Sequence, residues 1–564
     1  MHITIKGNMM ESNGKNIIIT SALPYANGEI HLGHIVSTYL PADIFARFCR
    51  SNNKNVVFTC ATDDFGTPIL LQSEKEKITP EKYIDFWNKR DLADFTNLGI
   101  SFDFFHNTSS TENIKLTQYF FQKILENNLI YKNEISQLYC EQDKKYLPDR
   151  YVLGTCPYCN EDDQYSDGCE KCGKAFIDRE ILKPRCAICN KTPKLKTSMH
   201  YFFKLSLLSS KLKTWLTNNS NLQNDVKNYV MKWIDDGLND WDITRDISWG
   251  VPIPLEEAKN KVLYGWFDNH ICYISSTLLF LENKNINGKE FWNNSIIYHF
   301  IGKDIVYHHY LFLSAMRLAI NEEYKLPEFI PTRGHLMLQG EKFSKSRGWY
   351  IGLGEFLDEF PADYLRFYLA RITPFNQSDV NFDWEDFAVK INNELVANVG
   401  NFIHRILSFI ESNYDCTVPE PKEYDKEDHE FLNKIRNANE NVTKHLEKNE
   451  IDKGLASILN FSDYCNQYFQ KREPWKNEES KNTTLYLSIN AVLSLSILLF
   501  PYIPFSIEKL LTNLNIERDK INWKTNVELF IKPGHEIKKP EILFKKIEKE
   551  SIEKQKNKLG KKIK

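Results

Sequence analysis

The chain has 564 residues, which exceeds the usual length of one domain and predicts several domains. Hydrophobic residues make up 42% of it and charged residues 26%, a globular composition that excludes a wholly disordered or fibrous protein. The 72 Lys and Arg against 75 Asp and Glu give a formal net charge of -3, which excludes a strongly basic nucleic-acid coat but allows a local basic patch.

The apolar stretches predict a cytoplasmic protein that does not cross a membrane. Met1 to Lys15 is polar and contains no apolar core of signal-peptide length. The longest apolar stretch, Leu485 to Phe500, contains three serines and an asparagine and ends before Pro501. Because it is shorter than the roughly 20 apolar residues of a membrane span, we expect a buried helix.

The first elements in chain order form a predicted β-α-β unit. Asn16 to Thr20 has the pattern of a buried strand, Leu23 to Gly28 contains turn-forming Pro and Asn-Gly, and His31 to Phe48 has apolar residues at helical spacing. A second strand follows at Asn55 to Ala61, and a second unit begins with Ile296 to Ile301. Such units imply a parallel sheet with ligands at the carboxyl ends of its strands.

Beyond about residue 376 the pattern changes from strands to long helices. Apolar residues recur at helical spacing over 386–413, 427–446, 451–470 and 484–500, which predicts a helix bundle. The last segment, Glu541 to Lys564, holds nine Lys against four Glu. We expect a solvated or frayed helix there, with a weak RNA-contacting tail as the alternative.

Two short motifs indicate polyphosphate chemistry. His31-Leu-Gly-His34 follows the first strand, so its histidines share a face at a helix N-terminus, where anions are favoured, and Gly33 lets a ligand approach the backbone. Lys342-Phe-Ser-Lys-Ser346 places two lysines in a Gly-bounded loop, where fixed cations stabilise the charge that grows during phosphoryl transfer. Either motif alone is compatible with a surface turn, but together they indicate one site.

With both motifs in this order, the sequence resembles the class I aminoacyl-tRNA synthetases. It is similar in particular to the methionyl-tRNA synthetase family, through residues 17–28, His299 to Ile305 and Leu147 to Val152. Trp249 to Pro254 and the third cysteine pair look closer to the archaeal and eukaryotic branch. The resemblance runs from about residue 16 to about residue 550. It implies an α/β fold: a split Rossmann-type catalytic domain with an inserted zinc-knuckle segment, followed by an α-helical bundle that binds the anticodon.

The resemblance also implies a division of the chain and a reaction. The parts are a first Rossmann half at 12–125, a connective insertion with zinc knuckles at 126–240, a second half with the lysine loop at 241–375, a helical anticodon domain at 376–530 and a basic tail at 531–564. The reaction activates L-methionine with ATP, accompanied by Mg²⁺, to methionyl-adenylate and pyrophosphate, and then transfers methionine to tRNA(Met). We expect a monomer.

The family's site residues carry over position by position. The resemblance implies that His31 and His34 hold the triphosphate and that Lys342 and Lys345 stabilise the departing pyrophosphate. The implied ATP-binding residues are His31, Gly33, His34, Gly302, Asp304 and Lys345. Asp63 is expected to pair with the ammonium group of methionine. The residues expected around the thioether, where aromatic rings contact sulfur favourably, are Leu23, Tyr25, Trp266, Tyr273, Ile305 and His309. For the apolar ones, plain core packing is the alternative.

The pocket segment departs from the family pattern at two positions. The family usually has Val-Trp-Phe-Asp-Ala-x-Ile-Gly-Tyr; this chain has Gly265-Trp-Phe-Asp-Asn-His-Ile-Cys-Tyr273, so Asn269 replaces a small apolar residue and Cys272 a glycine. A buried amide needs partners or costs desolvation energy. Two interpretations stay open: tolerated drift, or an altered affinity for methionine or for inhibitors, in which an Asn269→Ala, Cys272→Gly double variant lowers the KM for methionine.

Seven of the twelve cysteines lie between Cys140 and Cys189. Three Cys-x-x-Cys pairs favour structural Zn²⁺ over disulfides, because two such pairs supply four thiolates. The first predicted site is Cys156, Cys159, Cys169 and Cys172. A second would take Cys186 and Cys189, completed by Cys140 and Asp143, although Asp is a harder ligand than the Cys or His of related enzymes. Two questions stay open. The segment could hold one zinc ion or two, and the ligands could instead pair as 140/143 with 156/159 and as 169/172 with 186/189.

Three residues of the helical region match the family's anticodon-reading positions. Asn401 and Arg405 lie four residues apart and share a helix face, and Trp475 follows Lys471-Arg-Glu-Pro. Single-stranded bases are read by stacking and hydrogen bonds, with helix packing as the alternative role. A Leu, Ile or Val synthetase is disfavoured, because a compact cysteine-rich segment replaces their large editing insertion. A non-catalytic tRNA-binding paralogue and a synthetase with an altered amino-acid pocket are the alternative functions.

Overall fold

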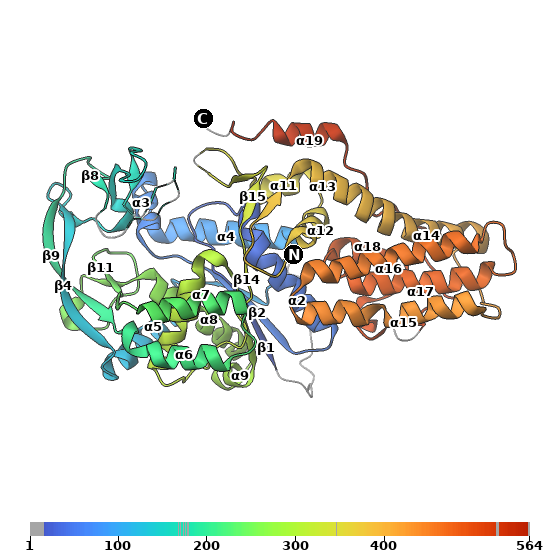
Figure 1. Ribbon diagram of the computed structural model, residues 1–564, viewed down its shortest axis with the longest axis horizontal. Coiled ribbons are helices and arrows are strands. Elements are labelled where there is room, and N and C mark those ends of the chain that lie inside the picture. Colours follow the sequence, from blue (N-terminus) through green and yellow to red (C-terminus); the bar gives the residue numbers. More distant parts are fainter. Residues whose placement is uncertain are drawn as a thin grey trace.

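The computed structural model describes residues 16–166, 168–169, 171–172, 174, 176, 180–345, 347–525 and 529–561, with the backbone alone at position 149. The predictions for Met1 to Lys15, for Ser346 and for the last three residues fall outside the described residues. Figure 1 shows an α/β part that carries a cysteine-rich lobe at one end and a bundle of long helices at the other.

A five-stranded parallel sheet forms the centre of the α/β part, in the order β14-β13-β1-β2-β3. Its strands are β1 (Ile17–Ser21), β2 (Val56–Thr62), β3 (Phe104–Asn107), β13 (Ile296–Gly302) and β14 (Thr332–Arg333). Strands β1 and β13 pair directly, with Ile17 opposite Ile296, and the chain continues to β2 on one side and to β14 on the other. This is a topological switch point, where ligands bind at the carboxyl ends of the strands.

Helices cover both faces of this sheet. They are α1 (Leu32–His34), the π-helical η1 (Ile35–Tyr39), α2 (Leu40–Ser51), α3 (Thr67–Glu76), α4 (Pro80–Leu98), α5 (Thr111–Glu126), α8 (Gly265–Glu282), α9 (Gly288–Asn294), the π-helical η6 (His308–Leu313) and α10 (Ser314–Ala319). The three predicted strands are confirmed to within one residue. The helix predicted at His31 to Phe48 is also confirmed, but it contains the π-helical turn η1.

The connective insertion is built on a long antiparallel ribbon. Strands β4 (Ile130–Cys140) and β9 (Lys194–Phe203) pair along their length and are flanked by β5 (Lys145–Tyr146) and β10 (Trp241–Asp242). The ribbon leads to a small sheet of β6 (Val152–Thr155), β7 (Gln164–Tyr165) and β8 (Leu182–Cys186), far from the helix bundle (Figure 1). The remaining elements are α6 (Ser209–Asn218), α7 (Asn224–Asp236), β11 (Thr244–Arg245) and β12 (Val262–Leu263).

The lysine loop belongs to a separate three-stranded sheet at the junction with the bundle. That sheet contains β15 (Leu336–Leu338), β16 (Glu341–Lys342) and β17 (Val380–Phe382). Helices α11 (Leu353–Glu359) and α12 (Ala362–Ile372) follow, and then α13 (Trp384–Lys390), the π-helical η7 (Ile391–Gly400), α14 (Asn401–Tyr414), α15 (Lys426–Glu447), α16 (Ile451–Arg472), α17 (Lys481–Leu499) and α18 (Pro504–Asn513). The predicted helix bundle is therefore confirmed.

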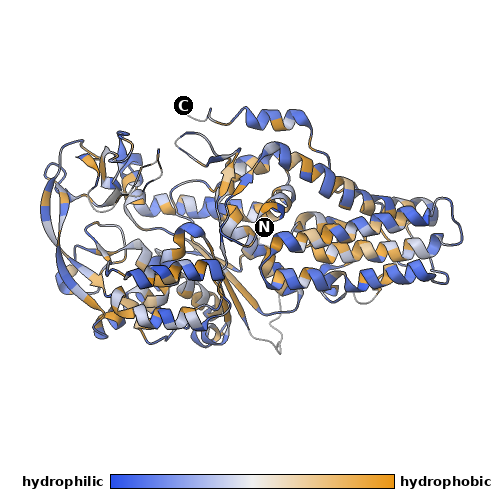
Figure 2. Cartoon of the chain, viewed as in Figure 1, coloured by the Kyte–Doolittle hydropathy of each residue, from blue (hydrophilic) through white to orange (hydrophobic). Residues whose placement is uncertain are grey.

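Helix α17 is the centre of that bundle. Among the described residues it alone is long and apolar enough to cross a membrane, but 94% of its apolar window is buried inside the protein. In Figure 2 the hydrophobic faces of the bundle helices turn toward one another, with hydrophilic residues outside. The predicted buried helix is thus confirmed.

The basic tail forms a helix that docks on the catalytic part. Helix α19 (Lys549–Lys556) docks on α13 and α11, where Lys556 pairs with Glu385, and Lys554 pairs with Glu359 at 2.8 Å. Ile552 is buried, and the backbone N–H of Gly560 donates to the carbonyl of Gly348 at 3.1 Å. The expected helix is present and largely exposed, but it is docked by Ile552 and by the lysine pairs with Glu359 and Glu385, where a frayed helix was the alternative.

Candidate active site

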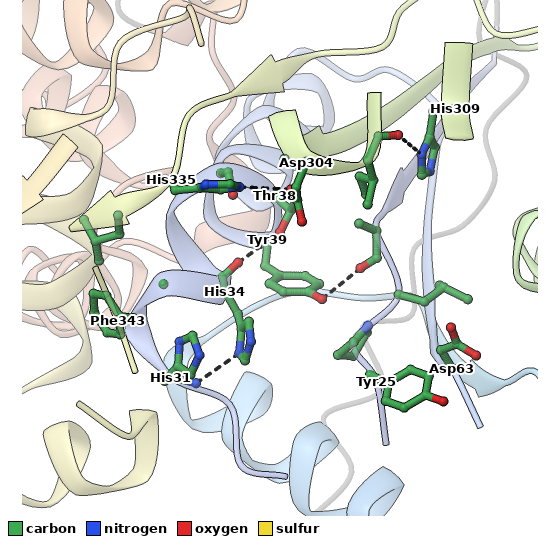
Figure 3. Close-up of a pocket in the computed structure, with 18 of the residues that line it drawn as sticks. Tyr25, His31, His34, Thr38, Tyr39, Asp63, Asp304, His309, His335 and Phe343 are labelled. Carbon is green, nitrogen blue, oxygen red and sulfur yellow. Dashed lines mark hydrogen bonds and ion pairs between the residues drawn. The ribbon is translucent and has the colours of Figure 1, made fainter. Parts of the chain in front are cut away.

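A cavity of about 530 Å³ opens at the carboxyl ends of β1, β2 and β13. It brings together thirteen of the predicted substrate residues: Leu23, Tyr25, His31, Gly33, His34, Asp63, Trp266, Tyr273, Gly302, Asp304, Ile305, His309 and Lys342. Figure 3 shows the two histidines of the first motif at one end and Tyr25 and Asp63 at the other. The cavity therefore has two different ends. The end at the histidines is the one predicted for the nucleotide, and the end at Tyr25 and Asp63 is the one predicted for the amino acid; they are called the nucleotide end and the amino-acid end.

The histidine pair is stacked and half-buried. The rings of His31 and His34 lie 3.6 Å apart and nearly parallel, and the backbone N–H of His31 donates to Nδ1 of His34 at 3.2 Å. Burial, then the neighbouring His34 and Lys345, lower the pKa of His31 to about 2, and burial together with Lys345 lowers that of His34 to about 3. Both rings are neutral at physiological pH and act as hydrogen-bond donors, not as charges.

The lysine loop closes over this pair. Phe343 stacks on His31 with ring centroids 5.2 Å apart, and Lys342 lines the cavity from an exposed position. Lys345 lies beside the cavity, where its Nζ donates to the carbonyl of Glu29 at 3.0 Å. Burial lowers the pKa of Lys345, against the charges of Glu29 and Asp91. The loop thus holds two cations beside two neutral donors.

Gly302 is the last residue of β13, and Asp304 follows it on the same side of the cavity. A Cβ at Gly302 would lie 2.6 Å from Oδ1 of Asp304, so a side chain here would displace the carboxylate. His335 bonds Asp304 at 3.1 Å. Burial raises the pKa of Asp304, but the hydrogen bond and charge of His335, a backbone hydrogen bond and the charge of His309 together outweigh it, and the pKa is lowered. Sequence reasoning missed His335: it follows the carboxyl end of β14, and a two-residue strand leaves too short a pattern to find.

The amino-acid end is lined by aromatic rings. Tyr273 donates its hydroxyl to Nε2 of His309 at 2.9 Å, and Nδ1–H of His309 donates to the carbonyl of Ile305 at 3.0 Å, which assigns the tautomer. Burial lowers the pKa of His309 to about 4. Trp266 stacks on His308 at 3.8 Å. These neutral rings form an apolar wall of the kind that contacts a thioether well.

Asp63 is fixed by its backbone and by one neighbouring side chain. Its N–H donates to the carbonyl of Pro24 at 2.8 Å, and its carbonyl accepts from Ala26 at 2.9 Å. Its Oδ2 accepts from Nδ2 of Asn269 at 2.7 Å. Asn269 lines the cavity, whereas Cys272 does not and instead contacts Ser276 at 3.4 Å. Of the two departures from the family pattern, only Asn269 faces the cavity.

The cysteines gather in two groups. Cys156, Cys159, Cys169 and Cys172 have ligand atoms within 4.8 Å of one another, as have Cys140, Asp143, Cys186 and Cys189. In the second group the thiols of Cys140 and Cys186 approach Oδ2 of Asp143 at 3.0 and 3.1 Å. The alternative pairing of 140/143 with 156/159 and of 169/172 with 186/189 is wrong. Both groups offer four converging soft or mixed ligands, which fits tetrahedral zinc.

The anticodon candidates lie together in the bundle. The guanidinium of Arg405 lies 5.6 Å from the ring centre of Trp475 and 5.0 Å from that of Phe469. Trp475 is 40% exposed, and Asn401 is exposed one turn before Arg405 on α14. The structure thus joins an accessible aromatic ring, a cation and an amide on one surface.

Comparison with known proteins identifies the family. A family model described as "tRNA synthetases class I (M)" matches residues 17–407, and one described as "Anticodon binding domain of methionyl tRNA ligase" matches residues 418–563. The methionine–tRNA ligase of Methanosphaera stadtmanae is 39% identical over 560 residues, covering 96% of this chain and 82% of the relative. That of Pyrococcus furiosus is 41% identical over 555 residues, covering 95% and 76%.

The same fold occurs in a solved structure. Mycobacterium tuberculosis methionyl-tRNA synthetase in complex with methionyl-adenylate superimposes with a TM-score of 0.79 at 24% identity, covering 94% of this chain and 100% of that one. The parallel sheet, the histidine pair and the lysine loop define a class I aminoacyl-tRNA synthetase. Within this class, the chain belongs to the methionyl-tRNA synthetase family. No comparison supports the alternative of a non-catalytic paralogue.

Proposed function

We propose that the protein ligates L-methionine to tRNA(Met), by way of methionyl-adenylate formed from methionine and ATP. The observation that carries this proposal is the single cavity with two chemically different ends. One end offers neutral imidazole donors and lysine ammonium groups, and the other offers the Asp63 carboxylate beside aromatic rings. A carboxylate and an α-phosphate brought together between these ends would react without a protein nucleophile, because positioning and charge stabilisation supply the catalysis.

At the nucleotide end, His31 and His34 are assigned to the triphosphate. Their lowered pKa values keep the rings neutral, so they donate N–H groups without adding charge before the reaction. Lys342 and Lys345 then stabilise the pyrophosphate as it departs, which is the step at which negative charge grows. Gly302 and Asp304 are assigned to the adenosine. Mg²⁺ accompanies ATP and supplies further charge neutralisation when bound.

At the amino-acid end, Asp63 is assigned to the ammonium group. Leu23, Tyr25 and Ile305 shape the pocket, and Trp266, Tyr273 and His309 are assigned to the thioether. Because the hydroxyl of Tyr273 already donates to His309, neither group presents an unpaired proton to sulfur. This favours an unbranched apolar side chain over a polar one.

The remaining partners follow from the bundle and the cysteine groups. Arg405, Trp475 and Asn401 are assigned to the anticodon, since an exposed ring and a guanidinium suit unstacked bases. The two cysteine groups are assigned one structural Zn²⁺ each. We expect the enzyme to act as a cytoplasmic monomer, with its oligomeric state to be measured by light scattering.

The test is ATP–pyrophosphate exchange with a panel of amino acids, followed by charging of tRNA(Met). Methionine alone is expected to support rapid exchange, and Lys345→Ala is expected to slow it by about 10²- to 10³-fold. Arg347→Ala, which removes a cation of the same loop that is paired with Glu341, is the matched control and is expected to retain the rate. Exchange with no amino acid would leave the non-catalytic paralogue as the better description, and exchange with another amino acid would leave the altered-pocket synthetase.

A further inference from the structure

The amino-acid end of the cavity contains two buried acceptors that no group of the described chain satisfies. Oδ1 of Asp63 and Oδ1 of Asn269 have no hydrogen-bond partner. Asn269 is only 3% exposed and Asp63 only 9%, and both residues line the cavity. An unsatisfied buried acceptor destabilises a folded protein, so two of them in one place indicate a donor that arrives with the ligand.

Asn269 lies where its side chain can contact both Asp63 and a ligand in the cavity. Trp266, Asn269 and Tyr273 are spaced by three and four residues on α8 and form one face of this helix, which lines the cavity. One N–H of the Asn269 amide donates to Oδ2 of Asp63 at 2.7 Å. The amide oxygen lies at the opposite side of the group and has no partner, so it can accept a hydrogen bond from the ligand.

Asp63 is the carboxyl group at this end that a cation can reach, because it lines the cavity, whereas Asp64 and Asp268 are fully buried outside it. Burial raises the pKa of Asp268 well above its usual value, which favours its neutral form. Burial and the nearby Asp64 raise the pKa of Asp63, the hydrogen bond from Asn269 and the nearby backbone N–H of Phe65 lower it, and the resulting pKa is about 7. Asn269 therefore favours the ionised carboxylate that an incoming cation needs.

We infer that Asn269 is a positioning and specificity-determining residue: its N–H orients the Asp63 carboxylate, and its Oδ1 accepts a hydrogen bond from the substrate's α-ammonium group. This inference rests on the proposed function, since it supposes that an amino acid enters this end. A primary ammonium has three donors, so it can bond Oδ1 of Asp63 and Oδ1 of Asn269 together. The small apolar residue usual in the family at this position could supply neither contact.

The inference reverses an expectation drawn from the sequence. If Asn269 were tolerated drift, its replacement by alanine would leave the KM for methionine unchanged, and if it were an obstacle to methionine, the replacement would lower the KM. If Asn269 binds the ammonium group, the same replacement weakens the binding of methionine and raises its KM. Cys272, the other departure, lies away from the cavity and contacts Ser276, so it takes no part in this contact.

The experiment compares two ligands that differ only in the ammonium group. Methionine is assayed as the substrate of ATP–pyrophosphate exchange, and 4-(methylthio)butanoate, which lacks the amine, as a competitive inhibitor. In Asn269→Ala and in the nearly isosteric Asn269→Leu, the KM for methionine is expected to rise about 10- to 100-fold, as for loss of a hydrogen bond to a charged group. The inhibition constant of the deaminated analogue and the KM for ATP are expected to stay within about twofold.

Controls separate the contact from damage to the helix. Cys272→Ala removes another buried side chain of α8 and is expected to leave the KM for methionine within about twofold. Two variants of different size are used, and the thermal unfolding midpoint of each is measured. If one of them folds poorly, the KM values of the other decide the result. Equal losses for methionine and the analogue would show a merely structural role, an unchanged KM for methionine would show drift, and a lower KM would show an obstacle; each of these results overturns the inference.

Failure of the proposed function gives a different pattern. If the unmodified enzyme activates another amino acid instead of methionine, the proposed substrate is wrong. The same comparison with that amino acid and its deaminated analogue then decides the role of Asn269. If no amino acid supports exchange, both the function and the inference fall.

Discussion

At the scale of single residues, the cavity separates hydrogen-bond donation from charge. His31 and His34 have lowered pKa values of about 2 and about 3, so neither titrates between pH 5 and pH 8. Positive charge comes instead from Lys342 and Lys345 on a loop. Before ATP binds, the imidazoles therefore keep one protonation state over the physiological range, while the lysines supply the charge.

The variant Gly33→Ala tests whether the reaction depends on the position of the His31 ring. A Cβ there would lie 3.0 Å from Cε1 and 3.1 Å from Nδ1 of His31. Because alanine favours a helix by up to about 1 kcal/mol, Gly33→Ala is expected to keep or raise the free energy of unfolding. Displacement of His31 is nevertheless expected to reduce the ATP–pyrophosphate exchange rate at least about tenfold.

Gly265→Ala is the matched control for this variant. Its Cβ would meet only the carbonyl oxygen of Phe65, at an ordinary 3.9 Å. Exchange at the normal rate in both variants would show that the position of the His31 ring does not limit the reaction.

At the scale of elements, the sequence predicted those strands and helices whose formation depends on the pattern of neighbouring residues. The strands Ile17–Ser21 and Ile296–Gly302 and the helix Lys426–Glu447 were predictable, because each has a continuous apolar periodicity. The π-helical segments and the docking of α19 were not, and the cysteine grouping was predicted with an alternative pairing left open. They depend on partners far away in the sequence: Asp143 joins Cys186, and Lys556 joins Glu385. For the same reason the sequence marked Asn269 as unusual but could not reveal Asp63 as its partner.

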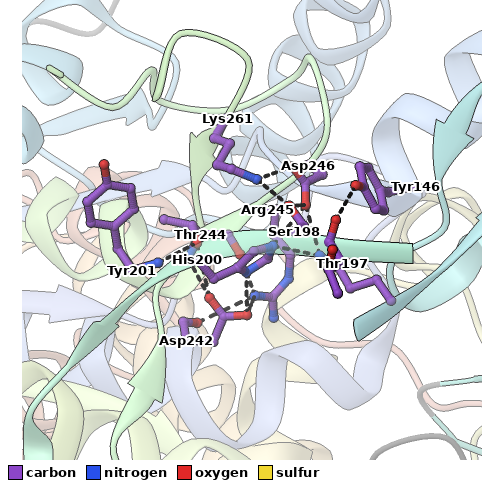
Figure 4. Close-up of polar contacts among 11 residues, drawn as sticks. Tyr146, Thr197, Ser198, His200, Tyr201, Asp242, Thr244, Arg245, Asp246 and Lys261 are labelled. Carbon is purple, nitrogen blue, oxygen red and sulfur yellow. Dashed lines mark hydrogen bonds and ion pairs between the residues drawn. The ribbon is translucent and has the colours of Figure 1, made fainter. Parts of the chain in front are cut away.

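The connective ribbon is braced by a buried histidine. His200 of β9 contacts Asp242 through Nδ1 at 2.7 Å and Asp246 through Nε2 at 2.8 Å (Figure 4). Lys261 and Gln137 also bond Asp246. Burial lowers the pKa of His200, but the two carboxylates outweigh it and the pKa is raised.

This brace predicts a pH-dependent stability. A raised pKa means that the folded protein holds the proton more tightly, so the stabilisation is fully present below about pH 6.5 and is lost as pH rises through the folded pKa. His200→Gln is expected to lower the free energy of unfolding by on the order of 1 kcal/mol at pH 6 and by less at pH 9. Denaturant unfolding at both pH values measures this, and a gap that widens with pH would contradict it.

We expect the two cysteine groups to bind zinc with unequal affinity. Four thiolates form the group at 156–172, whereas Asp143 replaces one thiolate in the other. Metal analysis is expected to find about two zinc ions per chain, and a chelator is expected to remove one first, because a carboxylate is the harder ligand. Asp143→Cys is expected to slow that first loss, and Cys156→Ser to affect the other ion. One zinc ion per untreated chain would refute the second site.

At the scale of the whole molecule, the catalytic part and the bundle are joined through their cores. Arg366 of α12 is fully buried and pairs with the fully buried Asp43 of α2 at 2.6 Å. The same guanidinium donates to the carbonyls of Pro501 and Tyr502 at the end of α17. Breaking such a buried pair costs about 3–5 kcal/mol, so this contact resists separation of the two parts.

The tail adds a second connection, from the end of the chain to the lysine loop. Deletion of residues 549–564 removes α19 and the contact of Gly560 with Gly348 but keeps Phe544 and Ile547 in the core. The loop then has more conformations to lose when ATP binds, so the KM for ATP is expected to rise several-fold, with a modest fall in thermal stability from the loss of buried Ile552. Lys539→Ala, which removes an exposed pair with Glu411 outside α19, is the control. An unchanged KM for ATP would show that the tail does not support the loop.

The docked tail also provides a means of observation. A Cβ at Gly560 would lie only 3.9 Å from the indole ring of Trp349, which directly follows the lysine loop. Indole rings quench many fluorescent dyes on contact, so a dye attached at Lys561 would brighten whenever the loop moved away. Nucleotide-driven movement of the loop could then be followed in real time from the far end of the chain, without altering any side chain in the cavity.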